Sequence, residues 1–307
     1  MTNSFQYRAF KFVSSLVCFL PYSFLAPVSK VLGWLYYRVA TKQRDRAIFH
    51  IKEHLDVTDK EAVSIIRKSF DKMAMTFLEV LYMPALDEKI VEKYVVFENR
   101  EYLEEAIAEG KGVIIVSAHM GNWEWFEAIL SLVGFQMSAI VKNQPNEEHT
   151  RLLNEYRQMF GIETYASGTT EIVKAGRALK KGRALGFLVD QDAAKEGFFM
   201  DFMGEMASTH VGAAYFARKF KSPILPGFIT RRPEGGHKII FFKSFHFEAN
   251  TGDIDQDIYD ITEKINKYII DAIKEHPDEW LWFKRRWDTQ YQGDIFNRKN
   301  RFQASEE

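Results

Sequence analysis

A histidine in the segment S-A-H-M-G-N-W-E (117–124) is the residue of this chain best suited to act as a general base. This residue, His119, follows V-I-I-V-S (113–117), a run rich in β-branched residues that predicts a buried strand. Open α/β sheets place ligands and reactive groups just beyond the carboxyl ends of their strands. We therefore expect His119 to lie on a loop at the edge of a sheet, where a substrate reaches it.

A carboxylate, Glu124, follows this histidine five positions later. On one continuous helix the two side chains would point about 140° apart, so the pair requires a loop between them. Gly121 supplies a tight turn and Asn122 an N-cap, which would place Glu124 in the first turn of the next helix. Glu124 would then orient the imidazole, whose other nitrogen is free to deprotonate a hydroxyl. The plainer alternative is a turn histidine beside a glutamate on a solvated helix face.

A second polar cluster, Asp190-Gln191-Asp192, follows another predicted buried strand, A-L-G-F-L-V (184–189). If the two strands run parallel, both clusters meet at the same edge of the sheet, and together they favour a functional site. The alternative is a helix cap or a turn, where aspartate is common.

Several other chemistries lack their signatures here. The sequence has no H-E-x-x-H zinc motif, no G-x-S-x-G serine-hydrolase elbow, and no Rossmann or P-loop glycine pattern. Cys18 is the single cysteine, which excludes a disulfide framework, and the net charge of −1 provides no basic field for nucleic acid. We predict that the protein needs no metal or cofactor and binds no nucleic acid.

The elements that position these clusters alternate between strands and helices from about residue 95 onward. Further strands are predicted at 138–142, 224–230 and 237–247, the last a candidate for antiparallel pairing, and helices at 122–133, 147–160, 170–181, 210–220 and 254–275. Upstream, apolar residues at helical spacing predict an amphipathic helix over 59–84. This pattern predicts an α/β fold with a mixed central sheet flanked by helices.

The N-terminal region resembles a membrane-associating segment. Residues 12–29 carry no charge, and Pro21 and Pro27 interrupt them. The first 50 residues hold one acid, Asp45, and seven cations: Arg8, Lys11, Lys30, Arg38, Lys42, Arg44 and Arg46. Such a segment is typical of two short helices in the membrane interface or a re-entrant hairpin, with a true span and buried core helices as alternatives. We expect a helical anchoring region at 1–94, a core at 95–295 and a tail at 296–307.

Five sequence blocks, in this order and spacing, resemble the lysophospholipid acyltransferase superfamily, and within it the late acyltransferases of lipid A biosynthesis. S-A-H-M-G-N-W-E resembles that family's H-x4-[DE] block, and G-F-L-V-D-Q-D (186–192) its D-Q block. F-M-D-F-M-G-E-M-A-S-T (199–209), Pro226-Gly227-Phe228 and D-E-W-L-W-F-K-R-R-W (278–287) resemble the later blocks. The resemblance covers nearly the whole chain. Lys142 departs from it, because family members often carry an arginine there, and lysine lacks the planar bidentate fork.

The resemblance implies transfer of a fatty acyl chain from an acyl thioester, on acyl carrier protein or coenzyme A, to a hydroxyl of a lipid A-type precursor. His119 would be the base and Glu124 the orienting acid, at the cytoplasmic face of a bacterial inner membrane. The resemblance places substrate contacts at seven further residues: Asn122, Lys142, Asp190, Gln191, Gly204, Ser208 and Arg285. Other acceptors (an aminolipid or a glycolipid), hydrolysis without an acceptor, and a non-catalytic membrane-binding homologue are the alternatives.

Overall fold

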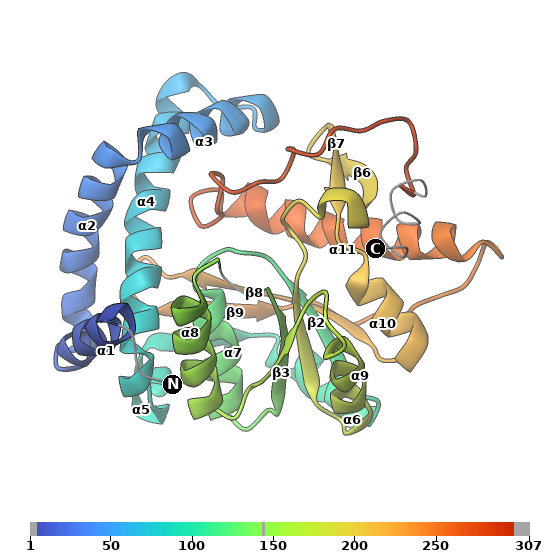
Figure 1. The fold of residues 1–307 in the computed structure, drawn as a ribbon, viewed down its shortest axis with the longest axis horizontal. Coiled ribbons are helices and arrows are strands. Elements are labelled where there is room, and N and C mark those ends of the chain that lie inside the picture. Colours follow the sequence, from blue (N-terminus) through green and yellow to red (C-terminus); the bar gives the residue numbers. More distant parts are fainter. Residues whose placement is uncertain (1–4, 143–144, 298–307) are drawn as a thin grey trace.

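A seven-stranded sheet forms the centre of the computed structural model, which describes residues 5–142 and 145–297 (Figure 1). The strands lie in the order β1-β9-β8-β2-β5-β3-β4. Their bounds are β1 (Val95–Glu98), β2 (Val113–Ser117), β3 (Met137–Val141), β4 (Glu163–Ala166), β5 (Ala184–Leu188), β8 (Ile224–Arg231) and β9 (His237–Phe241). Strands β8, β2, β5, β3 and β4 run parallel, whereas β9 pairs antiparallel with β8, and β1 runs parallel to β9. The carboxyl ends of β2 and β5 therefore meet at one edge.

Helices cover both faces of this sheet, as expected for parallel strands buried on both sides. One face packs against α6 (Arg100–Ala108), α7 (Trp123–Leu132) and α8 (Glu147–Met159). The other packs against α9 (Ile172–Lys180), α10 (Gly212–Phe220) and α11 (Ile254–Glu275). Each face has its own cluster of buried apolar side chains, so the sheet separates two cores.

The N-terminal helices form a further layer on one side of the sheet, at the left in Figure 1. They are α1 (Phe5–Cys18), η1 (Tyr22–Phe24), α2 (Leu25–Val39), α3 (Thr41–His54), α4 (Asp59–Tyr82), η2 (Met83–Ala85) and α5 (Glu88–Tyr94). A capping box starts α4, because Thr58 accepts from the backbone of Glu61 while the Glu61 side chain accepts from the backbone of Thr58. Helix α2 packs along α4 through Leu25, Ser29 and Gly33, its buried residues.

In the described part of the chain, no single helix is both long and apolar enough to cross a membrane. Two consecutive helical segments, Phe5–Cys18 and Tyr22–Val39, satisfy the length and hydropathy criteria only when taken together. The chain bends by 110° between them. Pro21 lies in the break between them. Much of their outer surface is apolar and exposed, with Phe12 at 65%, Phe19 at 85% and Val31 at 66%.

Most of the elements predicted from the sequence are present at nearly the predicted bounds. Strand β2 and helix α11 match them to the residue, and β9 pairs antiparallel with β8. The prediction of an α/β fold with a mixed central sheet is confirmed. The predicted strand over 237–247 is too long, since β9 ends at Phe241.

Several short elements were not predicted. The sequence analysis assigned no structure to β1, β4 or the antiparallel hairpin of β6 (Phe198–Phe202) and β7 (Glu205–Thr209). Each of these four short strands contains an acidic residue, so none of them is the continuous apolar run by which the equally short β2 was predicted. Most of the predicted tail, from residue 298 onward, lies outside the described residues.

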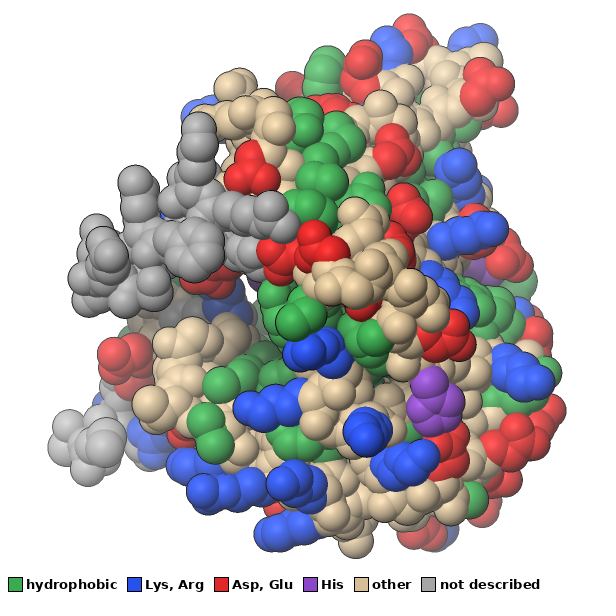
Figure 2. All heavy atoms as spheres, turned by 90° about the vertical axis from the view of Figure 1, so that its right-hand side faces the viewer, with side chains coloured by type: hydrophobic (Ala, Val, Ile, Leu, Met, Phe, Trp, Pro, Cys, Tyr) green, Lys and Arg blue, Asp and Glu red, His purple; other side chains and the backbone are tan. Residues whose placement is uncertain are grey.

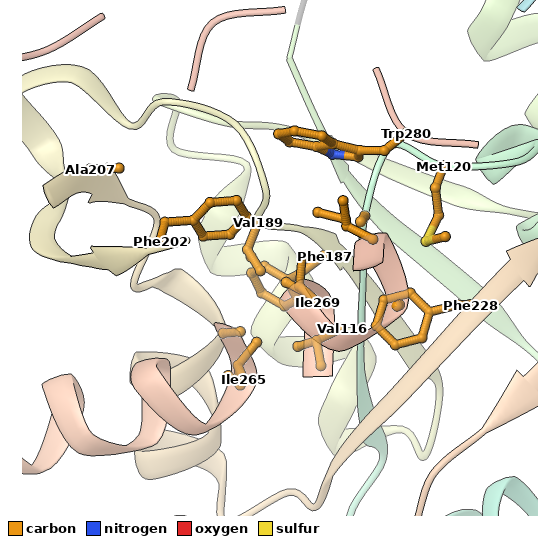
Figure 3. Close-up of a cluster of buried hydrophobic side chains, with 14 of the residues drawn as sticks. Val116, Met120, Phe187, Val189, Phe202, Ala207, Phe228, Ile265, Ile269 and Trp280 are labelled. Atoms are coloured by element: carbon orange, nitrogen blue, oxygen red, sulfur yellow. The ribbon is translucent and has the colours of Figure 1, made fainter. Parts of the chain in front are cut away.

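An apolar cluster beneath the carboxyl ends of β2 and β5 joins the sheet to the C-terminal part of the chain (Figure 3). Val116 and Phe187 come from β2 and β5, and Ile265 and Ile269 from α11. Trp280, which is 3% exposed, lies against the same cluster after α11 has ended. The C-terminal segment is thereby brought back to the ends of the two central strands.

Charge is unevenly spread despite the net charge of −1. On the face turned away from the N-terminal helices, basic side chains gather over the lower half (Figure 2). Helices α9 and α10 and the residues directly after them carry seven cations: Lys174, Arg177, Lys180, Lys181, Arg218, Lys219 and Lys221. Helix α9 ends where β5 begins, so most of this patch lies at the edge of the sheet opposite to the carboxyl ends of β2 and β5.

Substituting Gly33 with alanine should destabilise the protein. A Cβ at this position would lie 2.5 Å from the Cα of Asp71, so α2 and α4 would have to separate. Overpacking of this kind costs about 1–3 kcal/mol, whereas Gly→Ala in an unhindered helix gains about 1 kcal/mol. The two contributions to the stability of the Gly33→Ala variant have opposite signs, and the Tm from a thermal melt shows which one is larger. A higher Tm for Gly33→Ala would contradict the close packing of these helices.

Candidate active site

The loop that carries His119 begins where β2 ends and is held in a tight turn. Strand β2 ends at Ser117, and Gly121 has a φ of +56°, in the left-handed region that favours glycine. A Cβ at Gly121 would also lie 2.1 Å from the carbonyl oxygen of Ile229 in β8. Asn122 then caps α7, its side-chain oxygen accepting from the backbone N–H of Trp125 at 3.0 Å. The predicted loop, turn and cap are confirmed.

The imidazole of His119 is hydrogen-bonded to Asp190, just beyond the end of β5. Its Nδ1 lies 2.8 Å from Oδ1 of Asp190, and the other carboxylate oxygen accepts from the indole N–H of Trp280 at 2.7 Å. Asp190 is 1% exposed. Burial by itself would raise the pKa of this carboxyl, but the charge of His119 and the hydrogen bonds from His119 and Trp280 outweigh burial and hold the pKa below its usual value. Asp190 is therefore ionised at neutral pH.

An ionised carboxylate only accepts hydrogen bonds, so Nδ1 of His119 must carry the proton. In the neutral ring Nε2 then has a free lone pair. The His119 side chain is 21% exposed, and the edge of the ring meets Trp123 at a centroid distance of 5.1 Å. A base with a fixed tautomer and an accessible nitrogen is suited to removing a proton from a hydroxyl.

Glu124 has a different partner from the one expected. In the structure its two carboxylate oxygens accept from Nε and Nη2 of Arg157, in α8, at 2.9 and 2.5 Å, and the side chain makes no hydrogen bond with His119. Glu124 does lie in the first turn of α7, as predicted, but its carboxylate is directed to Arg157 of α8, and the imidazole has Asp190 as its partner instead. Burial raises the pKa of Glu127, one turn further along α7, to about 8.

Besides Asp190, three of the expected substrate-contacting residues lie at or near the same edge. Gln191 follows Asp190 directly and is partly exposed, and Lys142 is exposed immediately after β3. Asn143 and Gln144, next to Lys142, lie outside the described residues. The side chain of Arg285 is 79% exposed and pairs with Asp288 at 3.3 Å.

The other residues expected to contact the substrate are buried or lie in a turn away from His119. Asn122 is 0% exposed and donates to Glu79 at 2.9 Å, so both ends of its amide are occupied. Ser208 is 0% exposed and donates to the carbonyl of Ala194 at 2.6 Å. Gly204, with a φ of +90°, forms the turn between β6 and β7.

The sequence analysis did not single out three residues that shape this site. Arg157 gave no signal, because it is one of many charged residues on an amphipathic helix. Trp280 and Arg286 belong to the block D-E-W-L-W-F-K-R-R-W (278–287), which could have identified them. Arg286, rather than Arg285, is the buried arginine: it is 1% exposed and donates to the Ser208 carbonyl and the Thr209 hydroxyl at 2.6 and 2.7 Å.

Among residues 5–142 and 145–297 there is no group of three or more histidine, cysteine, aspartate or glutamate side chains that could hold a metal ion. The structure shows an α/β protein in which a histidine just beyond the carboxyl end of one central strand is hydrogen-bonded to a carboxylate just beyond the end of the neighbouring strand. The chain belongs to the bacterial lipid A biosynthesis acyltransferase family, whose model matches residues 3–289. It is therefore an acyltransferase, and we call the edge of the sheet that carries His119 and Asp190 the catalytic edge.

Curated relatives agree with this family. A lipid A biosynthesis acyltransferase of Haemophilus influenzae is 25% identical over 285 residues, which cover 91% of this chain and 86% of that protein. A lipid A biosynthesis lauroyltransferase of Escherichia coli is 23% identical over 287 residues, covering 91% of this chain and 90% of that protein. A phosphatidylinositol mannoside acyltransferase of Mycolicibacterium smegmatis is 21% identical over 239 residues, which cover 77% of this chain and 75% of that protein.

Asp190→Asn should lower kcat far more than Glu124→Gln. One amide oxygen cannot accept from both Trp280 and His119, so the N–H₂ group of the substituted amide would face Nδ1 and place the imidazole proton on Nε2. The wrong tautomer and the lost charge should together reduce kcat by about 10⁴-fold. Glu124→Gln keeps a neutral acceptor for Arg157 and should mainly lower the Tm, since it weakens a buried ion pair.

Steady-state rates and melting curves of the two purified variants are the measurement, with wild-type protein prepared in parallel. If folded Glu124→Gln loses turnover completely while Asp190→Asn keeps more than about a tenth of it, then Glu124 is the residue that orients His119.

Proposed function

We propose that this protein transfers a fatty acyl chain from an acyl thioester to a hydroxyl of a lipid A-type precursor, with His119 as the general base and Asp190 as its orienting carboxylate. The observation that carries the proposal is the hydrogen-bond chain from Trp280 through Asp190 to Nδ1 of His119, which leaves Nε2 as the acceptor. Glu124 contributes indirectly, by fixing Arg157 and with it the packing of α8 against α7.

The reaction needs one proton shuttle. Nε2 of His119 takes the proton of the acceptor hydroxyl as its oxygen attacks the thioester carbonyl carbon, and Asp190 stabilises the imidazolium that forms. The C–S bond of the tetrahedral intermediate then breaks, and the imidazolium returns its proton to the departing thiolate. An ester and a free thiol result, and no covalent acyl-enzyme is required.

The names of the relatives support the choice of acceptor. They refer to lipid A biosynthesis or to phosphatidylinositol mannosides, so a lipid A-type precursor is our first candidate and a glycolipid the second. Acyl carrier protein or coenzyme A would carry the thioester. Lys142, exposed beyond β3 at the catalytic edge, is our candidate for contact with an anionic substrate group. Lipid mass spectrometry of cells with and without the gene distinguishes the acceptors.

The N-terminal helices are our candidate for the membrane contact, at the cytoplasmic face of the inner membrane. They present exposed apolar side chains, among them Phe12, Phe19 and Trp34, between cations such as Arg8 and Arg38. Burial of apolar surface contributes about 25 cal/mol per Å², and each cation near anionic lipid about 1 kcal/mol. Two helices with a 110° bend suit contact with one leaflet.

His119→Ala should abolish acyl transfer while leaving the protein folded, because His119 supplies the proton-accepting nitrogen and is partly exposed. Loss of a general base lowers the rate by about 10²- to 10⁴-fold. The measurement is turnover of purified protein with a thioester donor and a lipid A-type acceptor, followed by mass spectrometry, with a melting curve as the folding control. A variant that keeps more than about a tenth of the wild-type rate would refute this assignment.

Replacing Phe12, Leu16 and Phe19 together with serine should release the protein from vesicles that contain anionic lipid. These side chains are 65%, 51% and 85% exposed, so the change removes apolar surface without opening the core. Deleting residues 1–40 would be less informative, because Tyr22 and Leu25 are buried and their loss would damage the fold.

A matched control replaces Val96, Met159 and Val173, which are exposed apolar residues outside the N-terminal helices, with serine. Co-sedimentation with vesicles should fall at least tenfold for the first triple variant and remain unchanged for the control. If the first variant sediments as the wild type does, the membrane contact lies elsewhere.

A further inference from the structure

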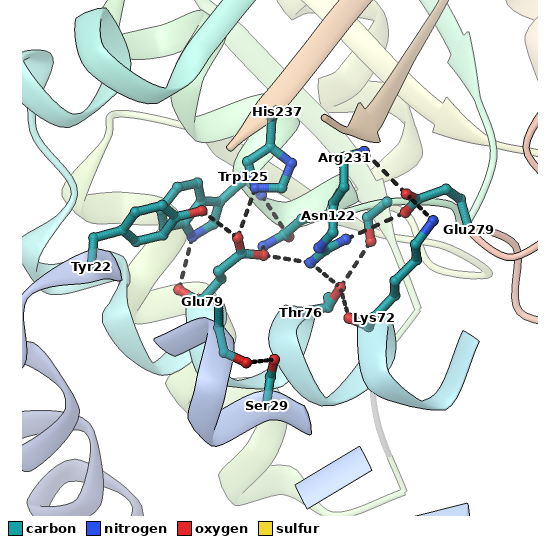
Figure 4. A network of polar contacts seen from close by, with 12 residues as sticks. Tyr22, Ser29, Lys72, Thr76, Glu79, Asn122, Trp125, Arg231, His237 and Glu279 are labelled. Atoms are coloured by element: carbon teal, nitrogen blue, oxygen red, sulfur yellow. Dashed lines mark hydrogen bonds and ion pairs between the residues drawn. The ribbon is translucent and has the colours of Figure 1, made fainter. Parts of the chain in front are cut away.

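A buried polar network lies directly behind the loop that carries His119 (Figure 4). At its centre is Glu79 of α4, which is 0% exposed. Its carboxylate accepts from Asn122 at 2.9 Å, Arg231 at 2.6 Å, His237 at 2.7 Å and the hydroxyl of Tyr22 at 2.7 Å. Burial would raise the pKa of Glu79, but Arg231 and His237 outweigh burial and lower the pKa to about 2, so the carboxylate is charged.

The same helix holds the loop at further points. The hydroxyl of Thr76 donates to the carbonyl of Gly121 at 2.9 Å, and the indole of Trp125 donates to the carbonyl of Glu79 at 2.8 Å. From the other side, the backbone N–H of Gly121 donates to the carbonyl of Glu279 at 3.2 Å. The two residues that follow Met120 are thus held by hydrogen bonds from α4 and from the C-terminal segment, and His119 directly precedes Met120.

Tyr22 connects this network to the N-terminal helices. It forms the first residue of η1, at the bend between α1 and α2, and it is 7% exposed. Its ring stacks on Trp125 of α7 with a centroid distance of 5.4 Å and an interplanar angle of 24°, while its hydroxyl donates to Glu79. The helices with the exposed apolar surface are therefore two hydrogen bonds away from the N-cap of α7, by the path Tyr22 to Glu79 to Asn122.

A charged buried carboxylate is sensitive to the loss of any donor, because each lost hydrogen bond leaves more of its desolvation cost uncompensated. If the N-terminal bend shifts, the Glu79 oxygen that accepts from Tyr22 keeps His237 as its remaining donor, and the carboxylate shifts toward its other partners. Asn122 is one of those partners, and a small displacement of a catalytic loop can reduce a rate by about 100-fold. The network therefore provides a physical link between the seating of the N-terminal helices and the position of His119.

We propose that Tyr22 and Glu79 are positioning residues through which the N-terminal helix pair holds the His119 loop in its reactive geometry. The inference rests on the proposed function, because it assumes that His119 is the base. It adds that the N-terminal helices, besides contacting a lipid surface, are part of the support of the catalytic site. Neither residue touches the substrate in this proposal, so each acts on kcat and leaves KM nearly unchanged.

Tyr22→Phe tests this proposal, with Tyr7→Phe as the matched control. Both tyrosines lie in the N-terminal helical segments, are 7% exposed and donate to a glutamate, but Tyr7 donates to Glu155 of α8 rather than to Glu79. We expect kcat to fall about tenfold for Tyr22→Phe, with KM for donor and acceptor within about twofold of wild type. Tyr7→Phe should keep a kcat within about twofold. Equal kcat values for the two variants at similar Tm would overturn the proposal.

Hydrogen–deuterium exchange gives a readout that does not depend on activity. Tyr22→Phe should speed amide exchange in peptides covering residues 118–125, whereas Tyr7→Phe should leave this segment at the wild-type rate. Unchanged exchange in that segment for Tyr22→Phe would overturn the link even if the enzyme is inactive. Conversely, faster exchange together with an active His119→Ala variant would uphold the link and refute the proposed base.

Discussion

The buried carboxylate of Asp190 sets the constraint that organises the catalytic edge. With 1% exposure it cannot be solvated, so the protein must supply donors to both oxygens, and it does so from two distant parts of the chain. His119 reaches it from the neighbouring parallel strand, and Trp280 from the segment after α11. After α11 the chain returns to the sheet. There Trp280 donates its indole N–H to this carboxylate and packs its ring against the apolar cluster below.

His119 is hydrogen-bonded to Asp190 rather than to Glu124, and this difference shows where sequence reasoning reaches its limit. The spacing of His119, Gly121 and Asn122 correctly predicted the loop, turn and helix cap, because local backbone chemistry decides them. The partner of the imidazole depends on strand order, which places β5 beside β2 although β3 and β4 lie between them in the sequence. Glu124 is not available to the imidazole, because both of its carboxylate oxygens accept hydrogen bonds from Arg157.

The same distinction applies to the fold. Buried parallel strands such as β2 and β5 are continuous apolar runs, and long helices such as α11 are periodic over many turns, so both were predicted at nearly their observed bounds. The hairpin β6–β7 and strand β1 exist because a partner strand satisfies their backbone, and that partner cannot be read from four or five residues. In the site, local signals identified His119, Asn122 and Asp190. Trp280 and Arg286 lie in a sequence block that could have identified them, whereas Arg157, whose role depends on tertiary contact alone, gave no signal.

Helix α4 explains why the N-terminal helices and the catalytic edge form one structure. Its surface toward α2 accommodates Gly33 at backbone contact distance, and Thr76 and Glu79 hold the His119 loop from a later part of the same helix. A 24-residue helix is stiff over its length, so displacing one end changes the other. The exposed apolar side chains of α1 and α2 therefore belong to the same packed framework as Asn122, so the surface that we propose for membrane contact and the loop that carries the proposed base share one support.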